Sequence, residues 1–411
     1  MMVNKPQINK ERLWQTHLEM AKIGATSGGG VGRLALTDLD RDARNLFISW
    51  AKEAELEVRV DQMGNIFARR PGENSTLPPV MTGSHLDTQP LGGRFDGAYG
   101  VLAGLEVMRA MNDVNVMTNT PLDVVVWTDE EGARFESGCM GVSVFTGKRK
   151  LEDALVCQDK DGITIGDELK RIGFNGSEPC GGYPVMAYIE AHIEQGPILE
   201  NERKTIGIVK GAQGQRCFKV SITGDEGHAG TLPMDQRKDA FQAAARMAVA
   251  IDQLAFDITP KSVITVGAVN VSPNSRNTIS GSTIFSIDSR CPDDNVLSNL
   301  ESLMRQICRD IAKERNVKVR FELVSYTPPV EFNDECFALI KMEATNRSIA
   351  NMEIYSGAGH DACHMSAIVP TGMIFVPCKD GISHNERESA NPNDLADGCS
   401  VLLDVISKLS S

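Results

Sequence analysis

The sequence predicts an α/β protein in which helices cover a mostly parallel sheet and a smaller βαββαβ domain is inserted into the chain. Two patterns predict this fold. Helix-spaced and strand-like apolar segments alternate in the first half, and near residue 215 the pattern changes to a strand-rich one. The length of 411 residues also exceeds the roughly 100–200 residues of a typical domain, so we expect two domains.

The first half shows the alternation that a helix-covered parallel sheet requires. Apolar residues recur at helical spacing in 9–23 and 38–54. Short apolar runs, typical of strands buried on both faces, follow at 79–82, 122–128 and 185–191. Strand patterns return near the C-terminus at 352–355 and 372–377. The region before this return is therefore an insertion into one larger domain.

The insertion is expected at 213–327, and the larger domain at 1–212 and 328–411. The predicted elements of the insertion, in chain order, are a strand at 217–224, a helix around 241–255, strands at 262–271 and 283–290, a helix around 297–311 and a strand at 317–324. This order is that of a split βαβ sandwich. Glycine at 211–214 suits a hinge at its start, and the prolines at 328–329 suit a linker at its end.

The charge and composition exclude several classes of partner. A formal net charge of −13 repels phosphate backbones and anionic lipid, so we expect neither nucleic acid nor a membrane as partner. Residues 1–15 are polar, and no apolar run approaches the roughly 20 residues of a spanning helix. The ten cysteines include no Cys-x-x-Cys pair, which indicates reduced thiols and a cytoplasmic protein.

Histidines and carboxylates gather in loops that follow the predicted strands. Only seven histidines occur in the chain. The segments that combine His, Asp or Glu with glycine or serine are 83–88, 92–97, 128–132, 191–197 and 383–386. Because ligands of open α/β sheets gather at the carboxyl ends of the strands, these segments can converge in space.

Imidazoles and carboxylates in one crevice form a mixed ligand set that suits Zn²⁺ and admits Mn²⁺, Co²⁺ or Ni²⁺. Two-metal hydrolases share one carboxylate between ions about 3.5–4 Å apart. The adjacent Glu130 and Glu131 suggest that one glutamate binds metal while the other accepts a proton from water.

Simpler interpretations apply to single residues. A histidine at a strand end is more often a hydrogen-bonding residue than a ligand, and only the combination of several such segments favours a metal site. His17 lies in a helical stretch, where packing is expected. The loop at 357–361, which contains His360, is either a substrate loop or a glycine turn, and the sequence leaves this open. The chain has no phosphate-binding Gly-x-x-x-x-Gly-Lys-Ser/Thr, no Gly-x-Ser-x-Gly and no His-Glu-x-x-His motif.

Together these segments resemble the amidase/hydantoinase/carbamoylase family within the dinuclear-zinc aminoacylase and carboxypeptidase superfamily. Its members include N-carbamoyl-L-amino acid hydrolases, β-ureidopropionases and allantoate amidohydrolases. The resemblance extends from about Arg12 to Ile406.

The resemblance implies two divalent metal ions per chain, zinc in the first place. One ion would be held by His85, Asp96 and His192, and the other by Asp96, Glu131 and His384. Glu130 would be the general base. Peptidase members usually carry a carboxylate at the position of His192, so this histidine favours the carbamoylase branch.

The resemblance also implies substrate contacts and an assembly. His228 would stabilise the oxyanion, and the residues that grip the substrate carboxylate would be Asn277 and Arg290, with help from Gln195 and Arg216. The strand pattern places Arg290 on a polar face, where arginines are usually just solvated, so the resemblance carries its assignment. A homodimer through the inserted lid and dimerisation domain is implied, with His228 reaching the metal site of the partner.

The expected function is metal-dependent hydrolysis of the carbamoyl C–N bond of an N-carbamoyl-L-amino acid or N-carbamoyl-β-alanine, giving the amino acid, CO₂ and ammonia. Gln89-Pro90 resembles the β-ureidopropionase subgroup. The alternatives are an allantoate amidohydrolase, an aminoacylase or dipeptidase, which His192 disfavours, and a non-catalytic binding protein, which the complete ligand set disfavours. The sequence leaves open which ureido acid is the substrate, which metal is native and which pathway the enzyme serves.

Overall fold

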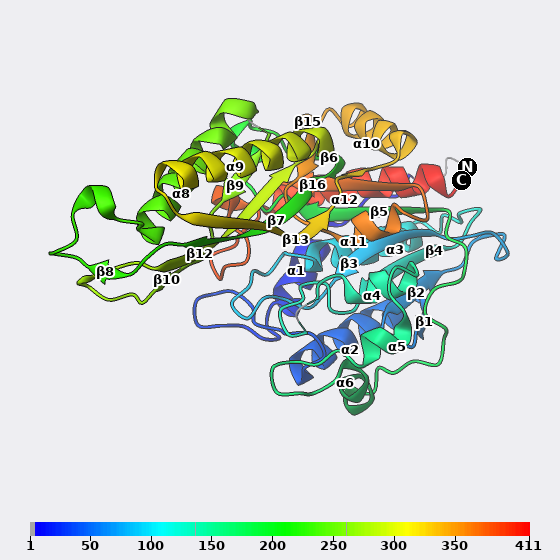
Figure 1. Cartoon of the computed structure of the whole chain (residues 1–411). Coiled ribbons are helices and arrows are strands. Elements are labelled where there is room, and N and C mark those ends of the chain that lie inside the picture. The colour runs from blue at the N-terminus through cyan, green and yellow to red at the C-terminus, as the bar shows by residue number, and fades with distance from the viewer. Residues whose placement is uncertain (1–4, 136, 260) are drawn as a thin grey trace. The chain divides into compact units, whose positions relative to one another are not determined.

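The computed structural model describes residues 5–135, 137–259 and 261–411, which divide into two compact units (Figure 1). The larger unit comprises Met1–Lys210 and Glu331–Ser411, and the smaller comprises Gly211–Val330. Each has its own hydrophobic core. None of the helices in the described residues combines the length and apolar character that a membrane span needs.

The larger unit is built on a nine-stranded sheet in the order β1-β2-β4-β3-β5-β16-β6-β14, with β15 beside β6. Its strands are β1 (Glu57–Val60), β2 (Ile66–Arg70), β3 (Val80–His85), β4 (Leu122–Trp127), β5 (Ala187–Ile193), β6 (Ile206–Ala212), β14 (Val330–Glu331), β15 (Asn351–Ser356) and β16 (Thr371–Val376). The central strands β4, β3, β5 and β16 are parallel, whereas β1, β2 and β6 pair antiparallel with their neighbours. This confirms the predicted helix-covered sheet with a parallel centre.

Every residue of the four parallel strands is buried. Such strands read as unbroken apolar runs because helices cover both faces of the sheet. The α-helices of this unit are α1 (Lys10–Met20), α2 (Asp38–Glu53), α3 (Ala98–Asp113), α4 (Met140–Phe145), α5 (Leu151–Leu155), α6 (Ile165–Ile172), α7 (Ile198–Asn201), α10 (Asp334–Asn346), α11 (Asp361–Met365) and α12 (Pro392–Leu409). A 3₁₀ turn, η2, spans Lys379–Gly381.

Side-chain caps fix where the first two helices begin. The Asn9 side chain accepts a hydrogen bond from the backbone N–H of Arg12, and Thr37 accepts one from the N–H of Asp40. Helix α3 was not predicted. It contacts β3, α1 and α12 and is buried around most of its circumference, so it lacks the polar stripe from which a surface helix is predicted.

The smaller unit has a five-stranded antiparallel sheet in the order β10-β12-β7-β13, with β9 also paired to β12. Its strands are β7 (Gly214–Thr223), β9 (Val263–Thr265), β10 (Val269–Ser272), β12 (Ser282–Cys291) and β13 (Lys318–Thr327). Helices α8 (Ala240–Ile258) and α9 (Asp294–Glu314) pack side by side against the sheet (Figure 1).

The chain order of these elements follows the expected βαββαβ pattern, with two differences. The strand expected at 262–271 is divided into β9 and β10, because the residues around Gly267 leave the ladder. In addition, β8 (Gly227–His228) and β11 (Thr278–Ile279) form a small separate ladder, and a 3₁₀ turn, η1 (Met234–Gln236), follows β8. Strands of two residues are too short for an alternation to reveal them.

Candidate metal centre

The candidate ligands of the larger unit lie where its parallel strands end. His85 is the last residue of β3, Glu131 follows β4, and His192 is the penultimate residue of β5. Asp96 lies in the loop between β3 and α3, and His384 lies in the loop after β16. The parallel register brings these strand ends to one edge of the sheet, as expected from the general rule for α/β sheets.

Three groups of candidate ligand atoms form there: one joins His192 to Glu190 and His360, and the other two share one carboxylate. His85, Asp96 and His192 offer atoms that lie within 4.8 Å of one another, and Asp96, Glu131 and His384 do the same. The Nε2 of His192 is 3.2 Å from Oδ1 of Asp96, whereas the Nε2 of His384 is 3.3 Å from Oδ2. The two oxygens of Asp96 therefore face different histidines, which is the arrangement of a bridging carboxylate.

The histidine rings are oriented as metal ligands usually are. Nδ1 of His85 lies 2.9 Å from the carbonyl oxygen of Asp87, and Nδ1 of His192 lies 2.9 Å from that of Ile193. With a metal bound, a proton on each Nδ1 would satisfy these carbonyls and leave the Nε2 lone pair for the ion. The donor set of imidazole nitrogens and carboxylate oxygens therefore fits a divalent transition metal or zinc.

The electrostatics of this cluster favour bound positive charge. Burial raises the pKa of Glu130 well above its usual value, and burial also raises the pKa of Glu131. The hydrogen bond to Asp96 raises the pKa of His384 to about 9. For His192, burial lowers the pKa, but the hydrogen bond and charge of Asp96 outweigh burial and raise it to about 9. Carboxylates buried this closely need protons or cations between them, which a divalent metal supplies.

Glu130 and Glu131 are held by a common neighbour. The carboxylate of Asp87 accepts hydrogen bonds from the backbone N–H groups of Glu130 (3.3 Å) and Glu131 (3.2 Å). Oε2 of Glu130 lies 3.4 Å from Nε2 of His85, and its Oε1 accepts a hydrogen bond from the thiol of Cys139 at 3.3 Å. Asp87 and Cys139 were not identified from the sequence, although Asp87 lies inside the 83–88 segment.

Two glutamines donate to the candidate ligands. Nε2 of Gln89 is 2.7 Å from Oε2 of Glu131, and Nε2 of Gln195 is 2.8 Å from Oδ2 of Asp96. The structure thus places Gln195, predicted as a substrate contact, beside a candidate metal ligand. In the sequence, Gln89 carries only the resemblance to the β-ureidopropionase subgroup.

His360 lies against this cluster. Its ring is buried, meets the ring of His192 edge-on at 4.6 Å between centroids, and shares a hydrogen bond of 2.8 Å with the hydroxyl of Ser356. Its loop is therefore packed beside a candidate metal ligand.

In the smaller unit, the structure brings His228 and Asn277 together. His228 pairs with Thr278 in the β8–β11 ladder, and the N–H of Ala229 donates to the carbonyl of Asn277. The His228 side chain is exposed, and its Nδ1 accepts a hydrogen bond from the N–H of Gly230. These contacts fix the two predicted residues side by side at one end of the unit.

The two predicted arginines have different surroundings. Arg290 makes two hydrogen bonds, of 3.1 and 3.0 Å, to the carboxylate of Asp288 two residues before it. Arg216 is bonded to Glu301 at 2.8 Å and to Asp294 at 3.1 Å, and it lies over the ring of Tyr326. Arg216 is therefore part of an ion-pair cluster that joins β7 to α9.

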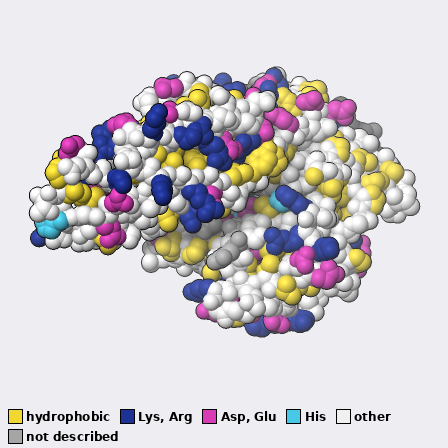
Figure 2. Space-filling view, in the orientation of Figure 1, with side chains coloured by type: hydrophobic (Ala, Val, Ile, Leu, Met, Phe, Trp, Pro, Cys, Tyr) yellow, Lys and Arg dark blue, Asp and Glu magenta, His cyan; other side chains and the backbone are white. Residues whose placement is uncertain are grey.

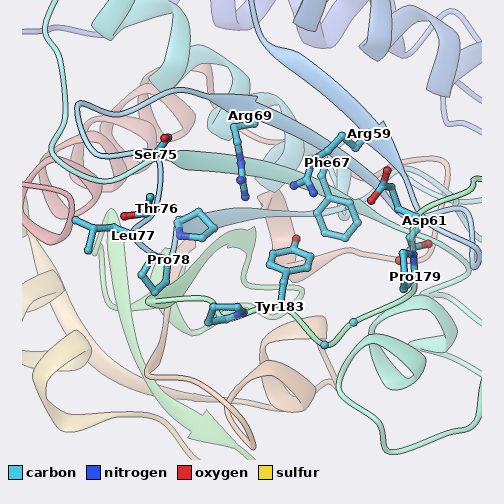
Figure 3. A pocket seen from close by; sticks show the side chains of 15 residues that line it. Arg59, Asp61, Phe67, Arg69, Ser75, Thr76, Leu77, Pro78, Pro179 and Tyr183 are labelled. Carbon is cyan, nitrogen blue, oxygen red and sulfur yellow. The ribbon is translucent and has the colours of Figure 1, made fainter.

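A cavity of about 520 Å³ lies elsewhere on the larger unit, beside β1 and β2 (Figure 3). Arg59 and Arg69 from these strands face Tyr183 across it, and the guanidinium of Arg59 lies 5.5 Å from the centre of the Tyr183 ring. Its lining includes Pro79 and Pro184, which come just before β3 and β5. The cavity thus lies towards the opposite ends of these strands and contains none of the predicted site residues.

Comparison with known proteins identifies the family. Residues 81–408 match peptidase family M20/M25/M40. The chain belongs to this family. It is 43% identical over 400 residues to the N-carbamoyl-L-amino-acid amidohydrolase of Rhizobium meliloti, covering 97% of this chain and 96% of the relative. It is 32% identical over 405 residues to the ureidoglycolate hydrolase of Arabidopsis thaliana, covering 95% and 85%.

The M20-family fold is also found in solved structures. An amidase of the hydantoinase/carbamoylase family from Burkholderia multivorans superposes with a TM-score of 0.95 and 48% identity, and 98% of each chain is covered. These matches confirm the resemblance to the amidase/hydantoinase/carbamoylase family. This M20-family chain is accordingly a hydrolase of the amidohydrolase type.

Proposed function

We propose that this hydrolase cleaves the carbamoyl C–N bond of an N-carbamoyl amino acid and releases the amino acid, CO₂ and ammonia. The observation that carries the proposal is the Asp96 carboxylate shared between two groups of ligands. His192 in one of these groups, and the activity named for the Rhizobium meliloti relative, favour a ureido acid over a peptide.

We assign two divalent metal ions to these groups, zinc by ligand type, with Mn²⁺, Co²⁺ or Ni²⁺ as alternatives. His85, Asp96 and His192 would hold one ion, and Asp96, Glu131 and His384 the other. When bound, such a pair polarises the substrate carbonyl and lowers the pKa of water from about 15.7 towards about 7.

Glu130 is the proposed general base. Its carboxylate is partly buried beside His85, and desolvation raises its pKa, so it has the basicity to accept the proton of the attacking water. It then returns this proton to the nitrogen that leaves as the carbamoyl C–N bond breaks. Asp87 fixes the backbone of Glu130 and thereby the direction of its carboxylate.

The substrate contacts are proposed in the smaller unit. His228 would stabilise the oxyanion, with Asn277 beside it. We assign the carboxylate grip to Arg290 with Asn277, and a helping role to Arg216, which two carboxylates from α9 also bind. Gln195 would contribute from the larger unit, where its amide lies at Asp96.

A homodimer through the smaller unit and a cytoplasmic location complete the proposal. All ten cysteines lie in the described residues and are free, which agrees with reduced thiols.

A substrate panel tests the function. Ammonia release should be measured from N-carbamoyl-β-alanine, N-carbamoyl-L-amino acids, allantoate and ureidoglycolate. The last is included because of the Arabidopsis thaliana relative, and allantoate because allantoate amidohydrolase is the closest alternative activity. We expect turnover of an N-carbamoyl amino acid, loss after prolonged chelation, and recovery with Zn²⁺, Mn²⁺ or Ni²⁺. Full activity in metal-free protein, or turnover of allantoate or ureidoglycolate without turnover of any N-carbamoyl amino acid, would overturn the proposal.

A further inference from the structure

Glu388 is a buried carboxylate next to the metal centre to which no role has yet been given. It lies in the loop after β16, four residues beyond His384, and only 1% of it is exposed. A carboxylate buried to this extent is costly unless hydrogen bonds satisfy it. Its partners therefore indicate what the carboxylate does.

The two oxygens of Glu388 hold the loop that carries Asp96. Oε1 accepts hydrogen bonds from the backbone N–H of Phe95 at 2.8 Å and of Asp96 at 3.2 Å. Oε2 lies 3.1 Å from the hydroxyl of Ser383, and the same hydroxyl lies 2.9 Å from Oδ2 of Asp96. Glu388 thus contacts the backbone of Asp96 directly and its side chain through Ser383.

The opposing loop is shaped to receive this carboxylate. A Cβ atom on Gly93 would lie 1.8–2.1 Å from the carboxylate atoms of Glu388, so a side chain at this position would force the carboxylate or the loop to move. Glycine at this position leaves the space that the Glu388 carboxylate occupies.

We propose that Glu388 is a positioning residue that holds Asp96 between the two ligand groups. Asp96 must direct one oxygen to each group, and the loop between β3 and α3 has no regular structure to fix it. Glu388 and Ser383 come from the segment that supplies His384, so they tie the shared carboxylate to the ligand of the second group. The inference rests on the proposed metal centre.

Metal titration of the chelator-treated full chain tests this role. Wild-type protein titrated with Zn²⁺ in a calorimeter should bind two ions. Glu388→Ala should bind at least one ion about 10–100-fold more weakly, the usual effect of losing a residue that orients metal ligands. Glu388→Gln should bind like wild type, because its amide oxygen accepts from the two N–H groups and its NH₂ donates to Ser383. Glu386→Ala, which removes a carboxylate two positions away, is the matched control and should change neither affinity.

Gly93→Ala provides an independent test if Glu388→Ala does not fold. Its methyl group should displace the Glu388 carboxylate and reproduce the weakened binding with Glu388 still present. Tight binding of both ions by Glu388→Ala or by Gly93→Ala would overturn the inference. Equal weakening in Glu388→Gln and Glu388→Ala would also overturn it, because hydrogen bonding would then not be the cause. Failure of wild-type protein to bind metal would instead contradict the proposed function.

Discussion

At the scale of single residues, Glu130 and Glu131 are adjacent in the chain, but their carboxylates face different groups. Glu130 lies 3.4 Å from His85, and Glu131 lies 3.3 Å from His384. Asp87 holds both backbone N–H groups, so neither side chain can take the place of the other without breaking this contact. The two residues should therefore differ in what their loss does.

Glu130→Gln should lower kcat by at least roughly 10²–10⁴-fold, the contribution of a positioned general base, and should leave the metal content near that of wild type. Glu131→Gln should instead lose metal, because a neutral amide is a poorer ligand than a carboxylate. Ammonia release and elemental analysis on the same samples separate the two effects. If the phenotypes were exchanged, the assignments of base and ligand would be reversed.

Arg290→Lys tests the carboxylate grip. A guanidinium binds a carboxylate through two parallel hydrogen bonds, which a lysine cannot reproduce. The variant should lose most of kcat/KM for N-carbamoyl acids, whereas the slower turnover of an N-alkylurea, which has no carboxylate, should change little. Arg216→Lys is the matched comparison. Equal losses on both substrates would assign Arg290 to the fold instead.

His17 is predicted to make stability depend on pH. It is buried against the rings of Phe95 and Tyr99, which confirms the packing interpretation, and within the described residues neither ring nitrogen has a hydrogen-bond partner. Burial lowers the pKa of His17 to about 3. An unfolded histidine binds a proton below about 6.5. Between these values only the unfolded state is protonated at this site, so the free energy of unfolding falls as the pH drops from about 6.5 towards 3.

His17→Phe should remove the contribution of His17 to the pH dependence of the free energy of unfolding. In metal-free protein, we expect its unfolding free energy to fall less steeply with acidification than that of wild type, by roughly 1.4 kcal/mol per pH unit. Urea unfolding at several pH values between 4 and 7 measures the two slopes. Identical slopes would mean that His17 is not kept neutral by the fold.

At the scale of elements, α2 is fixed to the larger unit by a fully buried ion pair. The side chains of Arg44 and Asp40 are both 0% exposed and meet at 2.8 Å. Arg44 also donates to the carbonyl of Gly64 and lies 3.3 Å from the hydroxyl of Thr128, which directly follows β4. The pair thus connects the helix to the strand end that leads to Glu130.

Arg44→Leu should lower the free energy of unfolding by about 3–5 kcal/mol, because Asp40 would remain buried without its cation. Replacing both residues by leucine should restore part of the loss, since no buried charge is then left alone. Urea unfolding of the two variants decides this. A single variant as stable as wild type would show that α2 is held by its apolar contacts alone.

At the scale of the whole molecule, the proposed homodimer involves the surface of the smaller unit. Large apolar side chains of the smaller unit are exposed, among them Phe241, Val249, Phe256, Val263, Val269 and Val324. Figure 2 shows hydrophobic side chains between charged ones over the region that carries α8 and α9. Exposed apolar patches are typical of interaction surfaces, and a second copy of the chain is the proposed partner of this unit.

Mixing two inactive variants tests both the dimer and the reach of His228. If His228 acts in the site of its partner, a His228→Ala chain and a Glu130→Gln chain should regain activity on subunit exchange, because one site of the heterodimer is then complete. Activity should be followed together with a tag-based assay of exchange. Exchange without any recovery would place His228 in the site of its own chain.

The sequence by itself determined the family and the strand ends at which the candidate ligands gather. The candidate ligands are His, Asp and Glu residues that directly follow short apolar runs. Such runs are typical of strands that helices cover on both faces, so the local pattern located the strand ends. The antiparallel strands β1, β2 and β6 and the largely buried α3 carry weaker patterns and were not predicted.

Tertiary structure alone decided which oxygen of Asp96 faces which histidine, that Arg216 is engaged by α9, and that Gln89 orients Glu131. It also decided that Glu388 contacts Asp96 across 292 positions of the chain. Contacts of this kind depend on how distant segments pack. The periodicity of a local sequence pattern indicates whether a segment is a helix or a strand, but it does not indicate which other segments that element will contact.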